Sequence, residues 1–221
     1  MCCAACSSVR AVLFDFDGTL ADTAPDLAAA VNWMRQKRWL APLDPAIVRP
    51  YASMGARGLL RIGFGMAPEH PDYEAMKNEF LERYAEAICE ETRLFPGMEQ
   101  LLAGLERRAI AWGIVTNKAA RFTARIVPRL GVSPACVVCG DSTPHLKPHP
   151  ASLLLAAEQL ELEPRACLYV GDDLRDVQAA RAAGMRSAAA GWGYHGTENG
   201  APGMWNADLL LSRPQELLEH L

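Results

Sequence analysis

The sequence predicts an α/β protein with a parallel, Rossmann-like sheet and an inserted helical domain. Short apolar runs, typical of strands buried on both faces, recur along the chain between longer segments of helical periodicity. This alternation is interrupted between Leu20 and Phe95, where helical periodicity continues without a convincing strand. The chain has 221 residues, 50% of them hydrophobic and 22% charged, which suits one globular domain or one domain with a smaller insertion.

Six apolar runs are expected to form the strands. They cover residues 9–14, 111–115, 135–138, 166–170, 186–190 and 208–211. Crossover helices are expected over residues 98–108, 119–130, 150–160 and 173–183. Each is short enough to be a crossover that joins two parallel neighbours with the usual right-handed sense. Pro150 suits a first helical turn, and Gly131 and Gly184 stand where a helix ends.

We expect residues 21–95 to form a helical cap domain, and residues 1–20 together with 96–221 to form the α/β core. Helices within the insertion are expected over residues 25–37, 45–51, 56–62 and 73–90. The turn Phe95-Pro96-Gly97 then returns the chain to the core. Residues 191–202 contain several Gly, Asn and Pro, so we interpret them as an irregular surface loop.

Charge and hydropathy exclude two classes of partner. The formal net charge is −4, and no cluster of Lys and Arg with interleaved aromatic residues occurs, so we expect no nucleic-acid partner. No apolar run approaches the roughly 18–20 residues that span a bilayer. The first residues lack the basic start and long apolar stretch of a secretory signal. These features predict a cytoplasmic protein without a membrane partner.

The 7 cysteines are an odd number in a chain large enough to fold without disulfides, which favours reduced thiols. Cys2, Cys3 and Cys6 could form a metal site, as could Cys136 and Cys139. No His or further Cys pair stands at a zinc-like spacing from either group. A frayed terminus and a buried strand are the favoured interpretations.

Polar residues follow several of the expected strands, and ligands of parallel sheets bind outside the carboxyl ends of the strands. Asp15-Phe16-Asp17-Gly18-Thr19 follows the first strand. Side chains two positions apart on an extended strand share a face, and two carboxylates this close repel unless a cation or a shared proton intervenes. The pattern predicts Mg²⁺ with oxygen ligands, plus a nucleophile or an acid/base pair. The alternative is a simple turn that ends the strand.

Thr116-Asn117-Lys118 follows the second expected strand and opens a helix, where hydroxyl, amide and backbone N–H donors form an anion site. An ordinary helix cap is the alternative. Lys147 precedes the next helix, and a lone lysine is usually solvated.

Gly171-Asp172-Asp173-Leu174-Arg175-Asp176 follows the expected strand at 166–170. Three carboxylates at a strand end need a cation. Asp173 and Asp176 also have the spacing of a helix cap.

The ordered set of Asp-x-Asp-Gly-Thr, Thr, Lys and Gly-Asp-Asp-x-x-Asp resembles the four motifs of the haloacid dehalogenase superfamily of phosphohydrolases. The resemblance covers essentially the whole chain, and the insertion resembles the helical cap of one large subgroup. Residues 12–26, 115–118 and 170–176 are similar to phosphoglycolate phosphatases. Residues 53–57, 64–66 and 171–176 are similar to N-acetylmuramic acid 6-phosphate phosphatases.

The resemblance implies that Asp15 attacks phosphorus and that Asp17 acts as acid and base. Dehalogenases of the superfamily lack the second carboxylate, and phosphatases have it. The cofactor implied is Mg²⁺, held by Asp15, the backbone carbonyl of Asp17 and Asp172. Asp173 or Asp176 would orient these ligands.

The resemblance also implies that Thr116 and Lys147 stabilise the transferring phosphoryl group. The substrate-binding residues expected around it are Gly18, Thr19, Asn117 and Lys118. Arg57 is a candidate cap residue for a carboxylate or a sugar hydroxyl, and a solvent-facing helix position is the alternative. Tyr194 and His195 either border the site or belong to the surface loop.

The function implied is a Mg²⁺-dependent phosphatase of a small phosphorylated metabolite. Phosphoglycolate is the first expectation. N-acetylmuramic acid 6-phosphate hydrolysis and a phosphosugar mutase activity are the alternatives within enzymes. A catalytically silent binding protein is disfavoured, because such a protein has no reason to keep the groups that chemistry requires. The chain is expected to be a monomer or a homodimer.

Overall fold

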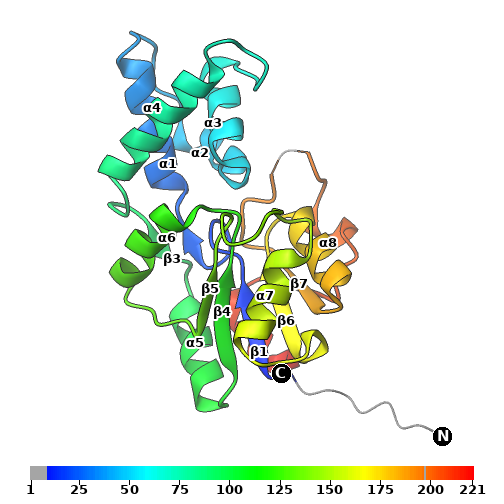
Figure 1. The fold of residues 1–221 in the computed structure, drawn as a ribbon. Coiled ribbons are helices and arrows are strands. Elements are labelled where there is room, and N and C mark those ends of the chain that lie inside the picture. Colours follow the sequence, from blue (N-terminus) through cyan, green and yellow to red (C-terminus); the bar gives the residue numbers. More distant parts are fainter. Residues whose placement is uncertain (1–8, 197) are drawn as a thin grey trace, which may run out of the picture.

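A computed structural model describes residues 9–196 and 198–221, and Cys2, Cys3 and Cys6 lie outside these residues. A six-stranded sheet with the order β5-β4-β1-β6-β7-β8 forms the centre of the fold (Figure 1). All neighbouring strands are parallel. The strands are β1 (Ala11–Phe14), β4 (Ala111–Val115), β5 (Cys136–Val138), β6 (Cys167–Gly171), β7 (Arg186–Ala190) and β8 (Leu209–Leu211). The predicted parallel α/β fold is confirmed.

The strand order places β1 between β4 and β6. The chain runs from β1 outward through β4 and β5, then crosses to β6 and continues outward on the other side. The order therefore reverses at β1. In open parallel sheets such a reversal leaves a crevice at the carboxyl ends of the strands.

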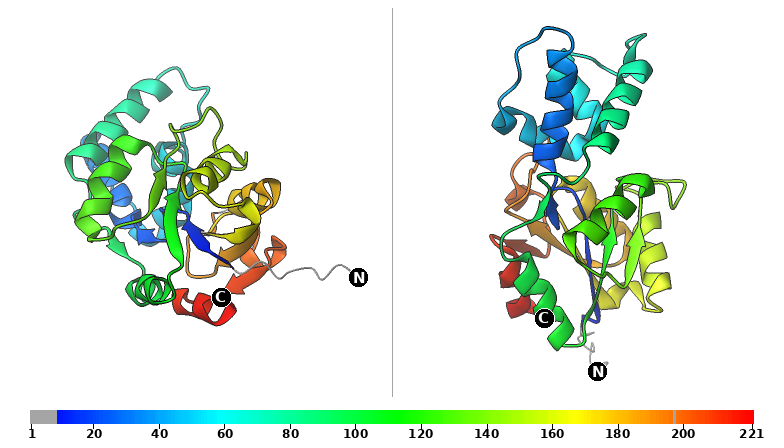
Figure 2. Two further views of the ribbon diagram at one scale, coloured as in Figure 1. Left: turned by 60° about the horizontal axis from the view of Figure 1, so that its bottom comes forward. Right: turned by 90° about the vertical axis from the view of Figure 1, so that its left-hand side faces the viewer.

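Helices cover both faces of the sheet (Figure 2). They are α5 (Met98–Arg107), α6 (Ala120–Ile126), α7 (Ala151–Gln159) and α8 (Leu174–Ala183). Short 3₁₀ helices are η2 (Val127–Leu130), η3 (Pro164–Ala166), η4 (Pro202–Met204) and η5 (Pro214–His220). The α-helix predicted to reach residue 130 ends at Ile126 and continues as η2, because Pro128 has no N–H to donate and disfavours a continued α-helix.

β1 contributes side chains to the hydrophobic clusters on both faces of the sheet. Val12 and Phe14 belong to one buried cluster, and Ala11 and Leu13 belong to another. All four side chains are fully buried, since alternate residues of a strand point to opposite faces and helices cover both. The buried strand ends at Phe14, so Asp15 is the first residue beyond it, at the carboxyl edge of the sheet.

The insertion stands above the carboxyl edge of the sheet (Figure 1). Its elements are α1 (Ala24–Gln36), α2 (Pro45–Val48), the 3₁₀ helix η1 (Arg49–Met54), α3 (Gly55–Phe64) and α4 (Tyr73–Glu86). The segment predicted as one helix over residues 45–51 is α-helical only to Val48. The helix predicted to reach residue 90 ends at Glu86.

Two short strands join the insertion to the sheet. β2 (Ala21–Asp22) and β3 (Arg93–Leu94) pair antiparallel where the chain leaves and returns. Elements of two residues carry no periodicity, so the sequence did not predict them. The domain boundaries at residues 20/21 and 95/96 stay a prediction.

The loop after β7 differs from the expectation. It contains no α-helix or strand over residues 191–196 and 198–202, as predicted. Tyr194 is only 5% exposed, however, so the surface-loop interpretation was wrong for this residue.

Among the residues that the structure describes, no helix is both long and apolar enough to cross a membrane.

Candidate active site

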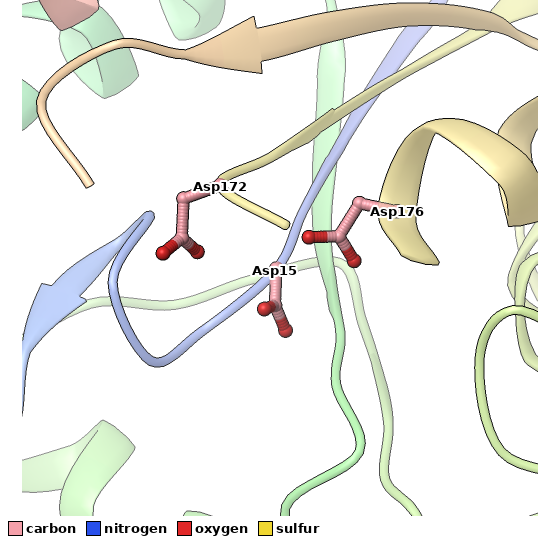
Figure 3. A group of neighbouring side chains, drawn as sticks. All are labelled: Asp15, Asp172 and Asp176. Carbon is pink, nitrogen blue, oxygen red and sulfur yellow. The ribbon is translucent and has the colours of Figure 1, made fainter. Parts of the chain in front are cut away.

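Three carboxylates converge at the carboxyl edge of the sheet (Figure 3). Asp15 follows β1, Asp172 follows β6, and Asp176 lies in the first turn of α8. One carboxylate oxygen from each lies within 4.8 Å of the other two. We call Asp15, Asp172 and Asp176 the acidic trio. Like charges at this distance repel, so the trio is a candidate site for a cation.

The electrostatics of the trio fit a divalent cation. Burial raises the pKa of Asp172 well above its ordinary value, and the charges of Asp15 and Asp176 add to the effect. Burial also raises the pKa of Asp176 to about 6, although the Lys147 ammonium opposes the shift. Three buried oxygen donors with too little positive charge around them suit a hard ion such as Mg²⁺. These residues could hold a metal ion.

Asp172 is held by groups from three segments. It accepts a hydrogen bond from the Thr19 hydroxyl at 2.8 Å and from the Tyr194 backbone N–H at 2.8 Å. The Ser53 hydroxyl of the insertion lies 3.4 Å away. The Thr19 hydroxyl, which we expected near the substrate, therefore orients a carboxylate of the trio, and Gly18 lies against Asp172.

Gly18 leaves no room for a side chain. Its φ is +87°, and a Cβ there would lie 2.3 Å from an Asp172 carboxylate oxygen and 2.8 Å from the Tyr194 ring. Gly18→Ala is expected to displace Asp172 and lower kcat about tenfold or more, because it combines backbone strain with a collision in the site. Steady-state turnover, followed as the phosphate release that the sequence resemblance implies, measures the effect.

Gly131→Ala is the matched control. Gly131 also has a positive φ, of +69°, but nothing lies within 4 Å of the position of its Cβ. It should lose stability through backbone strain and keep its kcat. An equal loss of kcat in both variants would show that general destabilisation, and not displacement of Asp172, explains the Gly18 result.

Lys147 contacts two members of the acidic trio, and its side chain is almost completely buried. Its Nζ is 2.8 Å from an oxygen of Asp15 and 2.8 Å from an oxygen of Asp176. It also donates to the Tyr169 hydroxyl at 2.7 Å and to the Val115 carbonyl at 3.2 Å. Burial lowers the pKa of Lys147, but the two carboxylates outweigh it and the net pKa is raised. This lysine is therefore a buried, charged partner of the trio.

Asn117 positions Lys147. Its side-chain amide accepts from the Lys147 backbone N–H at 2.9 Å and donates to the Lys147 carbonyl at 3.1 Å. The side chain expected to contact substrate thus fixes the backbone that carries the buried ammonium. Thr116 is buried at the end of β4, and its hydroxyl accepts from the Lys118 backbone N–H at 3.1 Å.

Asp17 has separate partners from Asp15. Phe16 between them is fully buried, and the Asp17 carboxylate accepts from Lys118 Nζ at 2.9 and 3.2 Å and from the Thr23 hydroxyl at 2.5 Å. Burial lowers the pKa of Lys118, but Asp17 outweighs it and the net pKa is raised. Lys118, expected to bind substrate, is therefore paired with the second carboxylate of the first motif.

A cavity of about 340 Å³ lies between the core and the insertion. Its core wall includes Asp15, Asp17, Thr116, Asn117, Lys118 and Lys147. Its opposite wall comes from the segment 52–56 and from apolar side chains of α4, Phe80 and Tyr84 among them. The Tyr84 ring lies over Lys118, with Nζ 4.7 Å from the ring centroid. The cavity therefore joins both carboxylates of the first motif to an apolar compartment.

Two predicted site residues, Arg57 and Asp173, lie outside the acidic trio. Arg57 is exposed and lines a smaller cavity of about 180 Å³ next to the main one. Asp173 is the N-cap of α8 and accepts from the Arg175 backbone N–H at 2.9 Å, in a capping box completed by Asp176. Asp173 lines both cavities, but its carboxylate is not part of the acidic trio.

Tyr194 is a residue of the site region whose place sequence reasoning left open. Its hydroxyl accepts from the backbone N–H groups of Thr23 and Ala24 at 2.8 and 2.9 Å, and donates to Asp22 at 2.9 Å. It thereby caps the start of α1, while its own N–H holds Asp172. A tyrosine in a glycine-rich loop has no periodic neighbours that would indicate burial.

The fold and the site together define an α/β enzyme with an acidic centre under a helical insertion. Residues 12–190 match the family of haloacid dehalogenase-like hydrolases, and the chain belongs to this family.

An N-acetylmuramic acid 6-phosphate phosphatase of Pseudomonas putida is 44% identical over 212 residues, which cover 95% of this chain and 94% of the relative. A phosphoglycolate phosphatase of Xanthomonas campestris is 45% identical over 215 residues, which cover 95% of each chain. A crystal structure from Haemophilus somnus, described as a predicted phosphoglycolate phosphatase, has a TM-score of 0.83 and 25% identity, with 96% of this chain and 97% of that chain covered. These matches confirm that the protein is a phosphatase of this family.

Proposed function

We propose that this phosphatase is a Mg²⁺-dependent phosphomonoester hydrolase that works through an aspartyl-phosphate. The observation that carries the proposal is that Asp15 belongs to the acidic trio, pairs with Lys147 and lines a cavity that Asp17 also lines. The substrate is a small phosphorylated metabolite. Phosphoglycolate is the first candidate, supported by relatives of that name. The protein acts in the cytoplasm, as a monomer or a homodimer.

Asp15 is the nucleophile of the proposed reaction. One of its carboxylate oxygens bonds to phosphorus while the bond from phosphorus to the leaving oxygen breaks. Lys147, 2.8 Å from Asp15, holds that carboxylate in place and offsets charge on the phosphoryl oxygens. The Thr116 hydroxyl and the adjacent backbone N–H groups hold the same oxygens.

Asp17 is the acid and base. It gives a proton to the leaving alkoxide, then takes one from the water that hydrolyses the aspartyl-phosphate. Lys118 and Thr23 keep its carboxylate at the cavity wall, apart from the trio. Residues 21–95 act as a cap that closes over the cavity and excludes bulk water.

Mg²⁺ would be held by Asp15, Asp172 and the backbone carbonyl of Asp17, with Asp176 beside them and Asp173 outside the trio. When bound, it supplies positive charge that offsets the repulsion between the carboxylate and a phosphate dianion. Gly18 and Thr19 keep Asp172 in position for this role.

Mg²⁺ is expected to raise the melting temperature by about 5 °C or more at pH 8, and by much less at pH 5. Asp172 and Asp176 have raised pKa values in the folded protein, so the folded state holds protons that the unfolded state has released. The metal-free protein therefore loses stability as pH rises from about 4, the ordinary carboxyl pKa, through the folded values. Mg²⁺ replaces those protons at neutral and higher pH. Thermal melts with and without Mg²⁺ measure the shift.

Asp172→Asn should remove most of the Mg²⁺ effect at pH 8. Asp208→Asn is a poor comparison because that carboxylate holds the Ser187 N–H. Asp72→Asn, on an exposed carboxylate before α4, is the suitable control and should keep the full shift. A shift of equal size at pH 5 and pH 8 would contradict binding to the ionised trio.

The cavity volume gives specific support to the alternative substrate. Pockets of roughly 300–1,000 Å³ bury ligands of drug size. At about 340 Å³ the cavity has more room than a two-carbon acid requires. N-acetylmuramic acid 6-phosphate, named for a relative 44% identical, is the larger candidate.

The test compares kcat/KM for phosphoglycolate and N-acetylmuramic acid 6-phosphate with Mg²⁺. A preference of about a hundredfold, or about 2.7 kcal/mol, assigns the substrate. Comparably poor rates on both mean that the cap recognises another leaving group. A requirement for a bisphosphate activator would reveal the mutase alternative. Absence of phosphate release from these substrates and from p-nitrophenyl phosphate would refute the proposed function.

A further inference from the structure

Arg175 connects the core to the insertion. Its Nε and Nη2 donate to the two carboxylate oxygens of Asp173 at 2.9 and 3.0 Å. Nη2 also donates to the backbone carbonyl of Ser53 at 2.9 Å. Asp173 belongs to the core motif after β6, whereas Ser53 belongs to η1 in the insertion. One guanidinium therefore bridges the two parts of the molecule.

The position of Arg175 in α8 does not explain why an arginine stands there. Arg175 stands in the first turn of α8, where a cation opposes the helix dipole. The carboxylate of Asp173 offsets this cost. A planar guanidinium can hold a carboxylate with two donors and still reach a third acceptor, which an ammonium on a flexible stem cannot reproduce. Arg175 does this here: two of its nitrogens bond to the Asp173 carboxylate, and one of them also bonds to the Ser53 carbonyl.

The segment held by Arg175 forms a wall of the cavity. Residues 52–56 all line it, and Arg175 lines it too. The Ser53 hydroxyl faces Asp172 of the acidic trio at 3.4 Å. Arg175 thus connects one wall of the cavity to the edge of the core that carries the acidic trio.

A second contact nearby is weaker. Arg61 of α3 pairs with Glu198 in the loop after β7, but both side chains are about half exposed, at 52% and 50%. Exposed pairs contribute little because water and salt screen them. The Asp173 side chain in the Arg175 pair is only 6% exposed. The Arg175 contact is therefore the more sheltered of the two.

We propose that Arg175 is a positioning residue that docks the Ser53 segment onto the core and so selects the leaving group. This rests on the proposed function for its effect on turnover. A substrate whose leaving group touches residues 52–56 depends on Arg175. Acetyl phosphate, a small activated compound whose leaving group needs no protonation, depends on the core motifs and much less on the docked segment.

The test compares Arg175→Ala, Arg175→Lys and the control Arg181→Ala. Arg181 is in the last turn of the same helix and does not line the cavity; its side chain donates to the Asn206 carbonyl at 2.9 Å. Arg175→Ala is expected to lower kcat/KM about 10- to 100-fold on the better of the two candidate substrates, mostly through KM, and less than about threefold on acetyl phosphate. Arg175→Lys should recover part of the loss, and Arg181→Ala should match the unaltered protein.

A purely structural role predicts a different pattern. Equal losses on the large substrate and on acetyl phosphate, in proportion to the fraction unfolded, would overturn the proposal. Unchanged kinetics in Arg175→Ala would overturn it as well. The split between the two substrates, and the partial recovery with lysine, are what docking requires.

Hydrogen exchange provides a readout that does not need turnover. Arg175→Ala should speed amide exchange over residues 49–56, and Arg181→Ala should not. If the unaltered protein hydrolyses none of the phosphate compounds, the proposed function fails, and exchange still decides whether Arg175 docks the segment. Unchanged exchange in Arg175→Ala would overturn docking even in an active enzyme.

Discussion

Asp15→Asn is expected to lower kcat by about a thousandfold or more. The amide has the shape of the carboxylate and fills the same space beside Lys147 and Asp172, but its oxygen is a far weaker nucleophile toward phosphorus. The variant should therefore fold, and the loss should appear in the chemical step. Single-turnover release of phosphate in the presence of Mg²⁺ measures that step directly.

Asp72→Asn makes the same chemical change at an exposed carboxylate outside the cavity and should keep full turnover. A melting temperature close to that of the unaltered protein shows that Asp15→Asn is folded. If Asp15→Asn keeps most of its turnover, another group attacks phosphorus. Asp17, in the same cavity, is then the first to be tested.

The sheet could be predicted because burial on both faces makes strands apolar along their whole length. β1 is fully buried on either side, and its end marks the start of the first motif. The pair β2 and β3 could not be predicted, since two residues show no period and their pairing depends on where the insertion begins and ends. Likewise, Pro50 and Pro128 turn the ends of two expected α-helices into 3₁₀ helices.

The sequence placed Asp15 and Asp172 directly after two expected strands, and the family resemblance implied that they meet. The structure brings them together because β1 and β6 are parallel neighbours in the sheet. The partners of other side chains did not follow from the sequence. Lys118 pairs with Asp17 on the core wall of the cavity, and the Asn117 amide bonds to the backbone of Lys147. Periodicity shows which residues share a face of a helix, but it does not show how that helix is rotated against the core. Arg57 was therefore a candidate for the site although its side chain is exposed.

Lys147→Met is expected to destabilise the metal-free protein by about 3–5 kcal/mol at pH 7 and to lower kcat about a hundredfold or more. The side chains of Lys147 and Asp176 are each only 3% exposed, and Asp15 lies at the same distance from the ammonium. Methionine fills the space but leaves buried carboxylates without their cation. Urea unfolding at several pH values measures the stability, and phosphate release measures the activity.

The loss of stability should shrink as pH falls, which separates lost charge from lost packing. Without the ammonium that opposes the raised pKa of Asp176, the folded protein favours protonated Asp176, so a proton supplies at pH 5 part of what Lys147 supplies at pH 7. Mg²⁺ should likewise restore part of the stability but not the activity, since it does not replace the N–H donors of Lys147. Lys37→Met, at an exposed pair with Glu79, should cost less than about 1 kcal/mol at every pH. A deficit in Lys147→Met that is independent of pH would mean that packing around the side chain, and not its charge, holds this part of the site together.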